Sequence, residues 1–283
     1  MNGFDEFDGE DVTAPADPKA ARRGRGIYLL PSILTLGSLL CGYYAIWTTF
    51  KGTMPDLDNA AKAIGLAIVF DMLDGFIARI THTDSEVGKQ FDSLADVISF
   101  GVAPALLAFA WGVSGLLVTS APEGLQVYRL GWLVGFAFLL CCAWRLARFN
   151  IQGMAPERSR YFVGLPTPAA AGMIAAMVHA VKYPLDTWWV SLLWLGLVLA
   201  LAVLMASNVR YVGFKEILWQ KRHSSLSFIL MGLLIAAIVL YSEVVLLTIA
   251  SLYLLSGMVS RLVRLMRHRL TSHPTNVNTN VNS

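Results

Sequence analysis

Eight apolar stretches occupy most of the chain between residues 32 and 264, and their lengths limit the possible folds more than any other feature. They cover residues 32–50, 58–80, 91–119, 127–149, 167–182, 187–206, 226–241 and 243–264. A helix that crosses a bilayer needs about 20 residues, and only helices and closed barrels can span lipid. The pattern predicts an all-α, polytopic helical membrane protein with about eight transmembrane helices. Because 167–182 and 226–241 are short, six spans with two re-entrant pieces are the alternative.

The composition supports this class and excludes others. Of the 283 residues, 56% are hydrophobic and 14% are charged, whereas a soluble domain carries about 25% charged residues. The basic residues are scattered between apolar stretches and form no face with stacking aromatic rings, which argues against nucleic acid as a partner. Membrane lipids are therefore the expected surroundings of the chain.

The ends of the chain differ from its middle. Residues 1–27 change from acidic to basic and are predicted to form a disordered cytoplasmic tail that ends at the membrane surface. Residues 28–265 are predicted to form one transmembrane domain, and residues 266–283 a polar C-terminal tail. Nothing in the acidic start resembles a cleaved signal peptide.

The distribution of basic residues predicts the orientation. With eight spans, only four of the 22 Lys and Arg residues fall on one side of the membrane, namely Lys51, Lys62, Arg129 and Lys182. The positive-inside rule then places both termini, and the turn at residues 81–90, in the cytoplasm.

The most informative motif lies across the second and third stretches. It reads Asp71-x2-Asp74-Gly75-x2-Ala78-Arg79-x8-Gly88-x3-Asp92-x3-Asp96. Asp71 and Asp74 share one helix face at i,i+3, and Asp92 and Asp96 share another at i,i+4. A short turn would bring the two faces together. Four ionised carboxylates cannot share a small dry space without cations, and hard oxygen ligands favour Mg2+ or Mn2+. The motif predicts two ions about 3.5–4 Å apart, which suits displacement at phosphorus.

The other motif positions fit a phosphate ligand. Gly75, Ala78 and Gly88 carry no bulky side chain, so a phosphate can approach the backbone, and Arg79 is a bidentate donor for phosphate oxygens. Asp71 lies about nine residues from the cytoplasmic end of its helix, on the order of 13 Å below the surface. A charge at that depth must line a polar cavity. Such a cavity suits a lipid substrate with a water-soluble head.

The motif resembles the signature of the CDP-alcohol phosphatidyltransferases, and all eight fixed positions match at the family spacing. Further runs resemble the serine-transferring branch of that family: Leu30-Pro-Ser-x-x-Thr35 leading to Gly42, Trp144-Arg-Leu-Ala-Arg-Phe-Asn150, Gly164-Leu-Pro-Thr-Pro168 and Ala206-Ser-Asn-Val-Arg-Tyr-x-x-Phe-Lys215. The similarity covers roughly residues 28–265. Ser32 departs from the family pattern, in which Asn often follows the proline.

The resemblance implies an enzyme of a bacterial inner (cytoplasmic) membrane, with a six-helix core plus two further helices. It implies transfer of a phosphatidyl group from CDP-diacylglycerol to L-serine with release of CMP, and a homodimer. It assigns the metal to Asp71, Asp74, Asp92 and Asp96, and the general base to Asp96. It assigns CDP-diacylglycerol binding to Asp74, Gly75, Ala78, Arg79 and Gly88.

The carboxylate of serine calls for a cation in the acceptor site. Arg145 and Arg148 lie at i,i+3 near the cytoplasmic end of an apolar helix, followed by Asn150. They are expected to hold the serine carboxylate, and the alternative is that they snorkel to lipid phosphates. Thr167 and Lys215 are further candidates.

Two other functions stay open at this point. One is transfer to another acceptor, such as glycerol phosphate, inositol phosphate or choline. The other is a divalent-cation transporter whose acidic residues line the ion path.

Overall fold

The computed structural model describes residues 18–81, 86–118, 122–153, 162–207, 210–211, 237 and 240–271. Its helices are α1 (Pro18–Lys51), α2 (Met54–Thr81), α3 (Glu86–Asp96), the π-helix η1 (Val97–Val102), α4 (Ala103–Val118), α5 (Pro122–Gly153), α6 (Thr167–Val181), α7 (Trp188–Ala206) and α10 (Ser242–Thr271). Two strands of two residues each, β1 (Phe162–Val163) and β2 (Arg210–Tyr211), pair antiparallel. The predicted all-α class is confirmed, with this short pairing as its one addition in the described chain.

The apolar stretches correspond to helices wherever the structure describes them. The stretch 91–119 differs from a single α-helix, because α3, η1 and α4 follow one another through it. The stretch 226–241 lies almost entirely outside the described residues. The number of eight spans therefore stays a prediction.

Among the residues that the structure describes, four helical stretches are long and apolar enough to cross a membrane. They are Ile33–Lys51, Glu86–Val113, Gly124–Ile151 and Trp188–Ala206. Helix α6 and the first part of α10 are apolar but shorter. Many large apolar side chains point outward, such as Leu40, Trp132 and Leu193, each at least 60% exposed. Outward apolar side chains on several long helices identify a multi-pass membrane protein.

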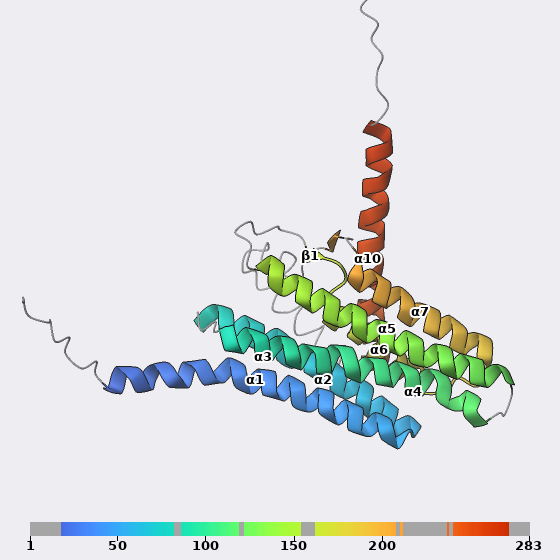
Figure 1. Cartoon of the computed structure of the whole chain (residues 1–283), viewed down its shortest axis with the longest axis horizontal. Helices are drawn as coiled ribbons and strands as arrows, with labels where there is room; N and C mark the ends of the chain where they lie inside the picture. Colours follow the sequence, from blue (N-terminus) through green and yellow to red (C-terminus); the bar gives the residue numbers. More distant parts are fainter. Residues whose placement is uncertain are drawn as a thin grey trace, which may run out of the picture.

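The helices lie along one another as a bundle, and α10 leaves it at a steep angle (Figure 1). Helices α2 and α6 pack against each other, and each carries fully buried small side chains: Ala60 and Ala67 on α2, and Ala170 and Ala171 on α6. Small residues allow helices in a bilayer to approach closely, because the surrounding lipid offers no hydrophobic drive for association.

A polar network around His179 ties α2, α6 and α10 together. The Nδ1 atom of His179 lies 2.5 Å from Asp58 Oδ1, and its Nε2 atom lies 2.9 Å from Ser242 Oγ. Asp58 also pairs with Lys62 at 2.7 Å. Asp58 precedes Asp71 by 13 residues, or about 20 Å of helix, so this network lies far from the acidic motif.

Helix α1 begins at Pro18, inside the segment 1–27 that the sequence analysis assigned to a tail, and α10 continues to Thr271. The division into two tails and one domain stays a prediction.

Candidate functional site

Two helices bring the acidic residues of the motif together. One carboxylate oxygen each from Asp71 and Asp74 on α2 and from Asp92 on α3 lie within 4.8 Å of one another. Asp96, at the end of α3, comes within hydrogen-bonding reach of the Asp71 carboxyl group. The predicted meeting of the two acidic faces therefore occurs.

The local sequence explains why the acids point inward. Helix α2 ends at Thr81 and α3 begins at Glu86, so only four residues separate the two helices. On α2 the neighbours Met72 and Leu73 are exposed, whereas Asp74 is only 6% exposed. Because apolar side chains next to the motif take the lipid-facing positions, the i,i+3 and i,i+4 spacing leaves the carboxylates on the inner face.

The donor set fits a hard divalent cation. All three members of the triad offer carboxylate oxygens, the ligands that Mg2+ and Mn2+ prefer. Three such groups within 4.8 Å of one another repel strongly in a partly buried site unless a cation or protons compensate their charge. The arrangement can hold a divalent ion.

Thr35 belongs to this site, although the motif analysis assigned it no role. Its hydroxyl donates a 2.6 Å hydrogen bond to Asp74 Oδ2, and both side chains are buried. The residues are 39 positions apart, so no local spacing links them. The only sequence signal for Thr35 is the run Leu30-Pro-Ser-x-x-Thr35. This run is part of the family resemblance but contains no chemical pattern of its own.

Arg145 comes from α5 and lies beside the acidic residues. It is 7% exposed and close enough to Asp71 and Asp96 to interact electrostatically. Its Nη1 atom donates a 3.2 Å hydrogen bond to Thr167 Oγ1. Its buried Nε atom has no hydrogen-bond partner among the described residues. The snorkelling alternative is wrong for Arg145, because a side chain this buried cannot reach lipid phosphates.

Arg148 has different surroundings. Its Nη1 and Nη2 atoms lie 3.4 Å and 3.3 Å from the carbonyl oxygens of Ala206 and Ser207, at the C-terminal end of α7. A guanidinium there satisfies carbonyl groups that the helix leaves without partners. Gly164 makes room for it, because a Cβ atom at Gly164 would lie 2.9 Å from Arg148 Nη2. Arg148 thus links α5 to α7.

Asn150, also on α5, donates a 2.9 Å hydrogen bond from Nδ2 to Ser93 Oγ. Ser93 follows Asp92 directly on α3. The structure therefore brings Asn150 next to the acidic helix, where it fixes α3 against α5.

The remaining predicted residues fall into two groups. Gly75, Ala78 and Gly88 are partly buried on the same two helices as the acids. The side chain of Arg79, and all of Lys215, lie outside the part of the chain that the structure describes.

The π-helix η1 begins directly after Asp96. It lies against α1, where Ser99 Oγ donates a 3.0 Å hydrogen bond to the carbonyl oxygen of Ser38. A Cβ atom at Gly42 would lie 2.8 Å from Ser99 Cα, so only glycine allows this approach. Short π-helical segments often occur at functional sites.

Comparisons with known proteins agree with this geometry. The family model for CDP-alcohol phosphatidyltransferase matches residues 28–202. A CDP-diacylglycerol–serine O-phosphatidyltransferase of Helicobacter pylori (strain J99) is 35% identical over 208 residues, which are 73% of this chain and 81% of the relative. Proteins of the same name are similar in Mycobacterium bovis (33% identity, 66% of this chain and 62% of the relative) and Methanocaldococcus jannaschii (34% identity, 60% and 71%). The acidic site and the match over more than half of the sequence lead to one conclusion: this chain belongs to the CDP-alcohol phosphatidyltransferase family.

Proposed function

We propose that this protein transfers the phosphatidyl group of CDP-diacylglycerol to L-serine, giving phosphatidylserine and CMP. One observation carries the choice of acceptor: a buried arginine, Arg145, is close enough to Asp96, the proposed general base, to interact with it electrostatically. The hydroxyl and the carboxylate of serine are attached to adjacent carbon atoms. A base and a cation near each other match that arrangement. The names of the similar proteins from three organisms support the same acceptor.

We assign the metal to the acidic residues. Asp71, Asp74 and Asp92 would hold a divalent ion, Mg2+ or Mn2+, with Asp96 as a fourth ligand to a second ion. When bound, such ions neutralise the diphosphate of the donor and stabilise the charge that develops on the leaving CMP.

The residues of the chain then have separate roles. Gly75, Ala78 and Gly88 leave space for the nucleotide, and Arg79 binds the diphosphate. Asp96 accepts the proton of the serine hydroxyl as the hydroxyl oxygen attacks the phosphorus that carries diacylglycerol. A new oxygen–phosphorus bond forms, the bond from that phosphorus to the CMP oxygen breaks, and CMP leaves.

We assign the serine carboxylate to Arg145 rather than to Arg148. The Nε atom of Arg145 is buried and has no partner among the described groups, and a buried donor of this kind is costly unless a ligand satisfies it. Arg148, by contrast, already faces the terminal carbonyl groups of α7. Thr167 orients Arg145 through its hydroxyl, and Lys215 stays a further candidate.

The reaction takes place at the cytoplasmic face in this proposal, with both termini in the cytoplasm and the bacterial inner membrane as the location. The basis is the excess of basic residues on one side. Assembly as a homodimer is an expectation from the family.

CMP release by the purified protein tests the proposal. The protein receives CDP-diacylglycerol, Mg2+ or Mn2+, and serine, glycerol phosphate, inositol phosphate or choline as acceptor. We expect release with serine only, and loss of release after chelation with recovery on adding back the ion. Release with another acceptor alone would exclude serine transfer, and no release with any acceptor would exclude the enzyme.

Arg145→Ala tests the acceptor site. Loss of a charge-assisted hydrogen bond costs about 1.5–3 kcal/mol, so kcat/KM for serine should fall roughly ten- to a hundred-fold with little change for CDP-diacylglycerol. Arg145→Lys should recover only part, because an ammonium group lacks the planar fork. Arg148→Ala is the matched control. An unchanged KM for serine in Arg145→Ala would place the carboxylate elsewhere.

A further inference from the structure

The polar network around His179 has the geometry of an activated serine. His179 on α6 lies between Asp58 on α2 and Ser242, the first residue of α10. Its Nδ1 atom faces Asp58 Oδ1 at 2.5 Å, and its Nε2 atom faces Ser242 Oγ at 2.9 Å. A nucleophile within hydrogen-bonding reach of a base, with the base oriented by a third group, identifies nucleophilic catalysis on unrelated folds.

The partners of the imidazole ring determine which nitrogen atom carries its proton. A carboxylate can only accept a hydrogen bond, so the Nδ1 atom of a neutral His179 donates to Asp58. The Nε2 atom is then left with its lone pair toward Ser242, whose hydroxyl donates to it. This is the tautomer in which His179 can take the proton of the serine hydroxyl.

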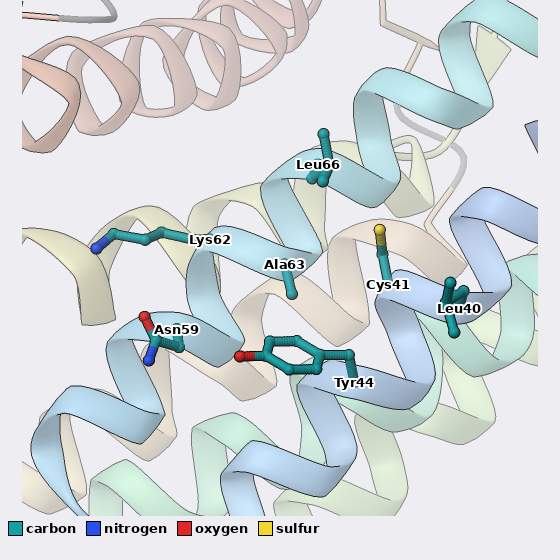
Figure 2. A pocket seen from close by; sticks show the side chains of 7 residues that line it. All are labelled: Leu40, Cys41, Tyr44, Asn59, Lys62, Ala63 and Leu66. Carbon is teal, nitrogen blue, oxygen red and sulfur yellow. The ribbon is translucent and has the colours of Figure 1, made fainter.

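Asp58 is held in the orientation that this tautomer needs. Lys62 extends from α2 away from Tyr44 of α1 (Figure 2), and its Nζ atom lies 2.7 Å from Asp58 Oδ2. The two oxygen atoms of Asp58 therefore have separate partners, Oδ1 facing His179 and Oδ2 facing Lys62. Lys62 fixes the carboxylate without displacing the histidine.

The start of α10 supplies donors for a negative charge that develops next to Ser242. The N–H group of Val245 donates a 3.0 Å hydrogen bond to the carbonyl oxygen of Tyr241, the residue before the helix. The N–H groups of Glu243 and Val244 therefore have no acceptor within α10. In α/β-hydrolases, the N–H group of the residue that follows a serine at a helix start forms part of the oxyanion hole. The N–H group of Glu243 stands in that position here.

The side chains around Ser242 favour an apolar ligand. Leu240, Tyr241 and Val244 flank it and are between 66% and 72% exposed. Ser242 itself is only partly buried, so a molecule that lies along these side chains can reach its hydroxyl. An acyl chain is such a molecule.

The depth of Ser242 in the membrane favours an ester bond. Lys182, at the end of α6, pairs with Glu243, the residue after Ser242. Tyr183 directly follows Lys182, and Trp188 begins α7; both rings are at least 50% exposed. Exposed Tyr and Trp side chains at helix ends are typical of the boundary between lipid tails and water. Ester bonds join the acyl chains of lipids to their polar parts, so they lie at the same boundary.

We propose that Asp58, His179 and Ser242 form a second catalytic site, which hydrolyses carboxylic esters of apolar acyl chains. Ser242 Oγ attacks the carbonyl carbon while its proton passes to His179 Nε2. The bond from that carbon to the alcohol oxygen breaks, the alcohol leaves with the proton, and the acyl group stays on Ser242. Water then attacks the acyl carbon and gives a proton to His179. The fatty acid leaves as Ser242 regains a proton from His179.

This second site is separate from the acidic site. About 20 Å of helix lies between Asp58 and Asp71, and the two sites share no residue. The inference therefore goes beyond the proposed phosphatidyl transfer and does not depend on it.

Labelling with an alkyl fluorophosphonate tests the nucleophile. This probe forms a phosphorus–oxygen bond with an activated serine and releases fluoride. In the full-length wild-type protein in detergent, mass spectrometry should find one adduct, on the peptide that carries Ser242. Ser242→Ala should abolish it. Ser256→Ala is the matched control and should keep it, because Ser256 also lies on α10 but its hydroxyl donates to the carbonyl oxygen of Tyr253. An unlabelled wild-type protein, or an adduct at another residue only, would overturn the proposal without any need for a variant.

Two variants distinguish an activated serine from a serine that only links helices. A general base contributes about 10²–10⁴-fold, so His179→Gln should lower the rate of labelling at Ser242 about a hundred-fold or more. Asp58→Asn should lower it as well, because an amide can hold the other tautomer of the histidine. Size-exclusion elution and the thermal midpoint in detergent show whether each variant is folded. An unchanged labelling rate in folded His179→Gln would refute the catalytic site.

Hydrolysis of p-nitrophenyl octanoate tests the reaction itself. The wild-type protein should release p-nitrophenolate, and release should fall to the background rate in Ser242→Ala. Chelation removes the ions that the acidic site needs and should leave this hydrolysis unchanged, so the result is independent of CMP release. Labelling of Ser242 without hydrolysis of the ester, or hydrolysis that stops on chelation, would overturn the assignment.

Discussion

Replacing Thr35 by valine should damage the acidic site while leaving the bundle intact. Valine has nearly the shape of threonine but lacks the hydroxyl that donates 2.6 Å to Asp74 Oδ2. A hydrogen bond to a charged acceptor contributes about 1.5–3 kcal/mol, which corresponds to roughly a ten- to hundred-fold effect. Without the bond Asp74 can rotate, so both the apparent affinity for the metal and kcat/KM should decrease.

The assay is a titration of CMP release with Mg2+ or Mn2+ at fixed CDP-diacylglycerol and serine. Thr35→Ser keeps the hydroxyl and should restore most of the activity. Thr49→Val is the matched control, because Thr49 is equally buried on α1 and its hydroxyl donates to the carbonyl oxygen of Ala45 in its own helix. If Thr35→Val matched the wild type at every metal concentration, or if Thr49→Val lost as much, Thr35 would not position Asp74.

Three further predictions concern the general base, the orientation in the membrane and the polar network around His179. Asp96→Asn keeps the shape of the side chain but cannot take the serine proton, so CMP release should fall by about a hundred-fold or more while donor binding stays near normal; near-normal release would remove Asp96 as the base. Thr83→Cys, in a chain without its native cysteines, should resist an impermeant maleimide applied to intact cells, and ready labelling would reverse the proposed orientation. His179→Leu removes the partner of Asp58 and Ser242 and should lower the free energy of unfolding by about 1–3 kcal/mol. Thermal unfolding in detergent measures this change, and an unchanged midpoint would mean that the network adds no stability.

The acidic site could be predicted because its pattern is local. Asp71 and Asp74 share a face through helical periodicity alone, as do Asp92 and Asp96, and the few residues between Thr81 and Glu86 bring the two pairs together. Periodicity and a short connection are properties of the sequence itself, so no knowledge of the packing of other helices was needed.

The partners of this site could not be predicted in the same way. Arg145 and Arg148 stand in equivalent positions of one sequence pattern, yet only Arg145 is buried beside Asp96. The difference arises because α5 packs against α7, whose terminal carbonyl groups engage Arg148. Such a choice depends on contacts between residues about 58 positions apart, which local spacing does not encode.

The π-helix was also beyond sequence reasoning. The run from Val97 to Val102 contains no proline and continues the apolar stretch, so nothing in it marks a change of helix type. Within it, Ser99 lies close to Gly42 of α1, a tertiary contact that local spacing does not encode.

Helices α3, η1 and α4 follow one another as one long helical rod. The π-helix η1 lets the parts before and after it take different rotations about the helix axis. Before η1, the phase of the helix is fixed by the carboxylates that meet α2; after it, by fully buried packing residues such as Leu107. Winding an additional residue into the rod turns everything beyond it by about 100° relative to an unbroken α-helix. In an unbroken α-helix, one rotation about the axis would have to direct both the carboxylates toward α2 and the buried apolar side chains toward their neighbours. Here the acidic half and the packing half each have a phase of their own.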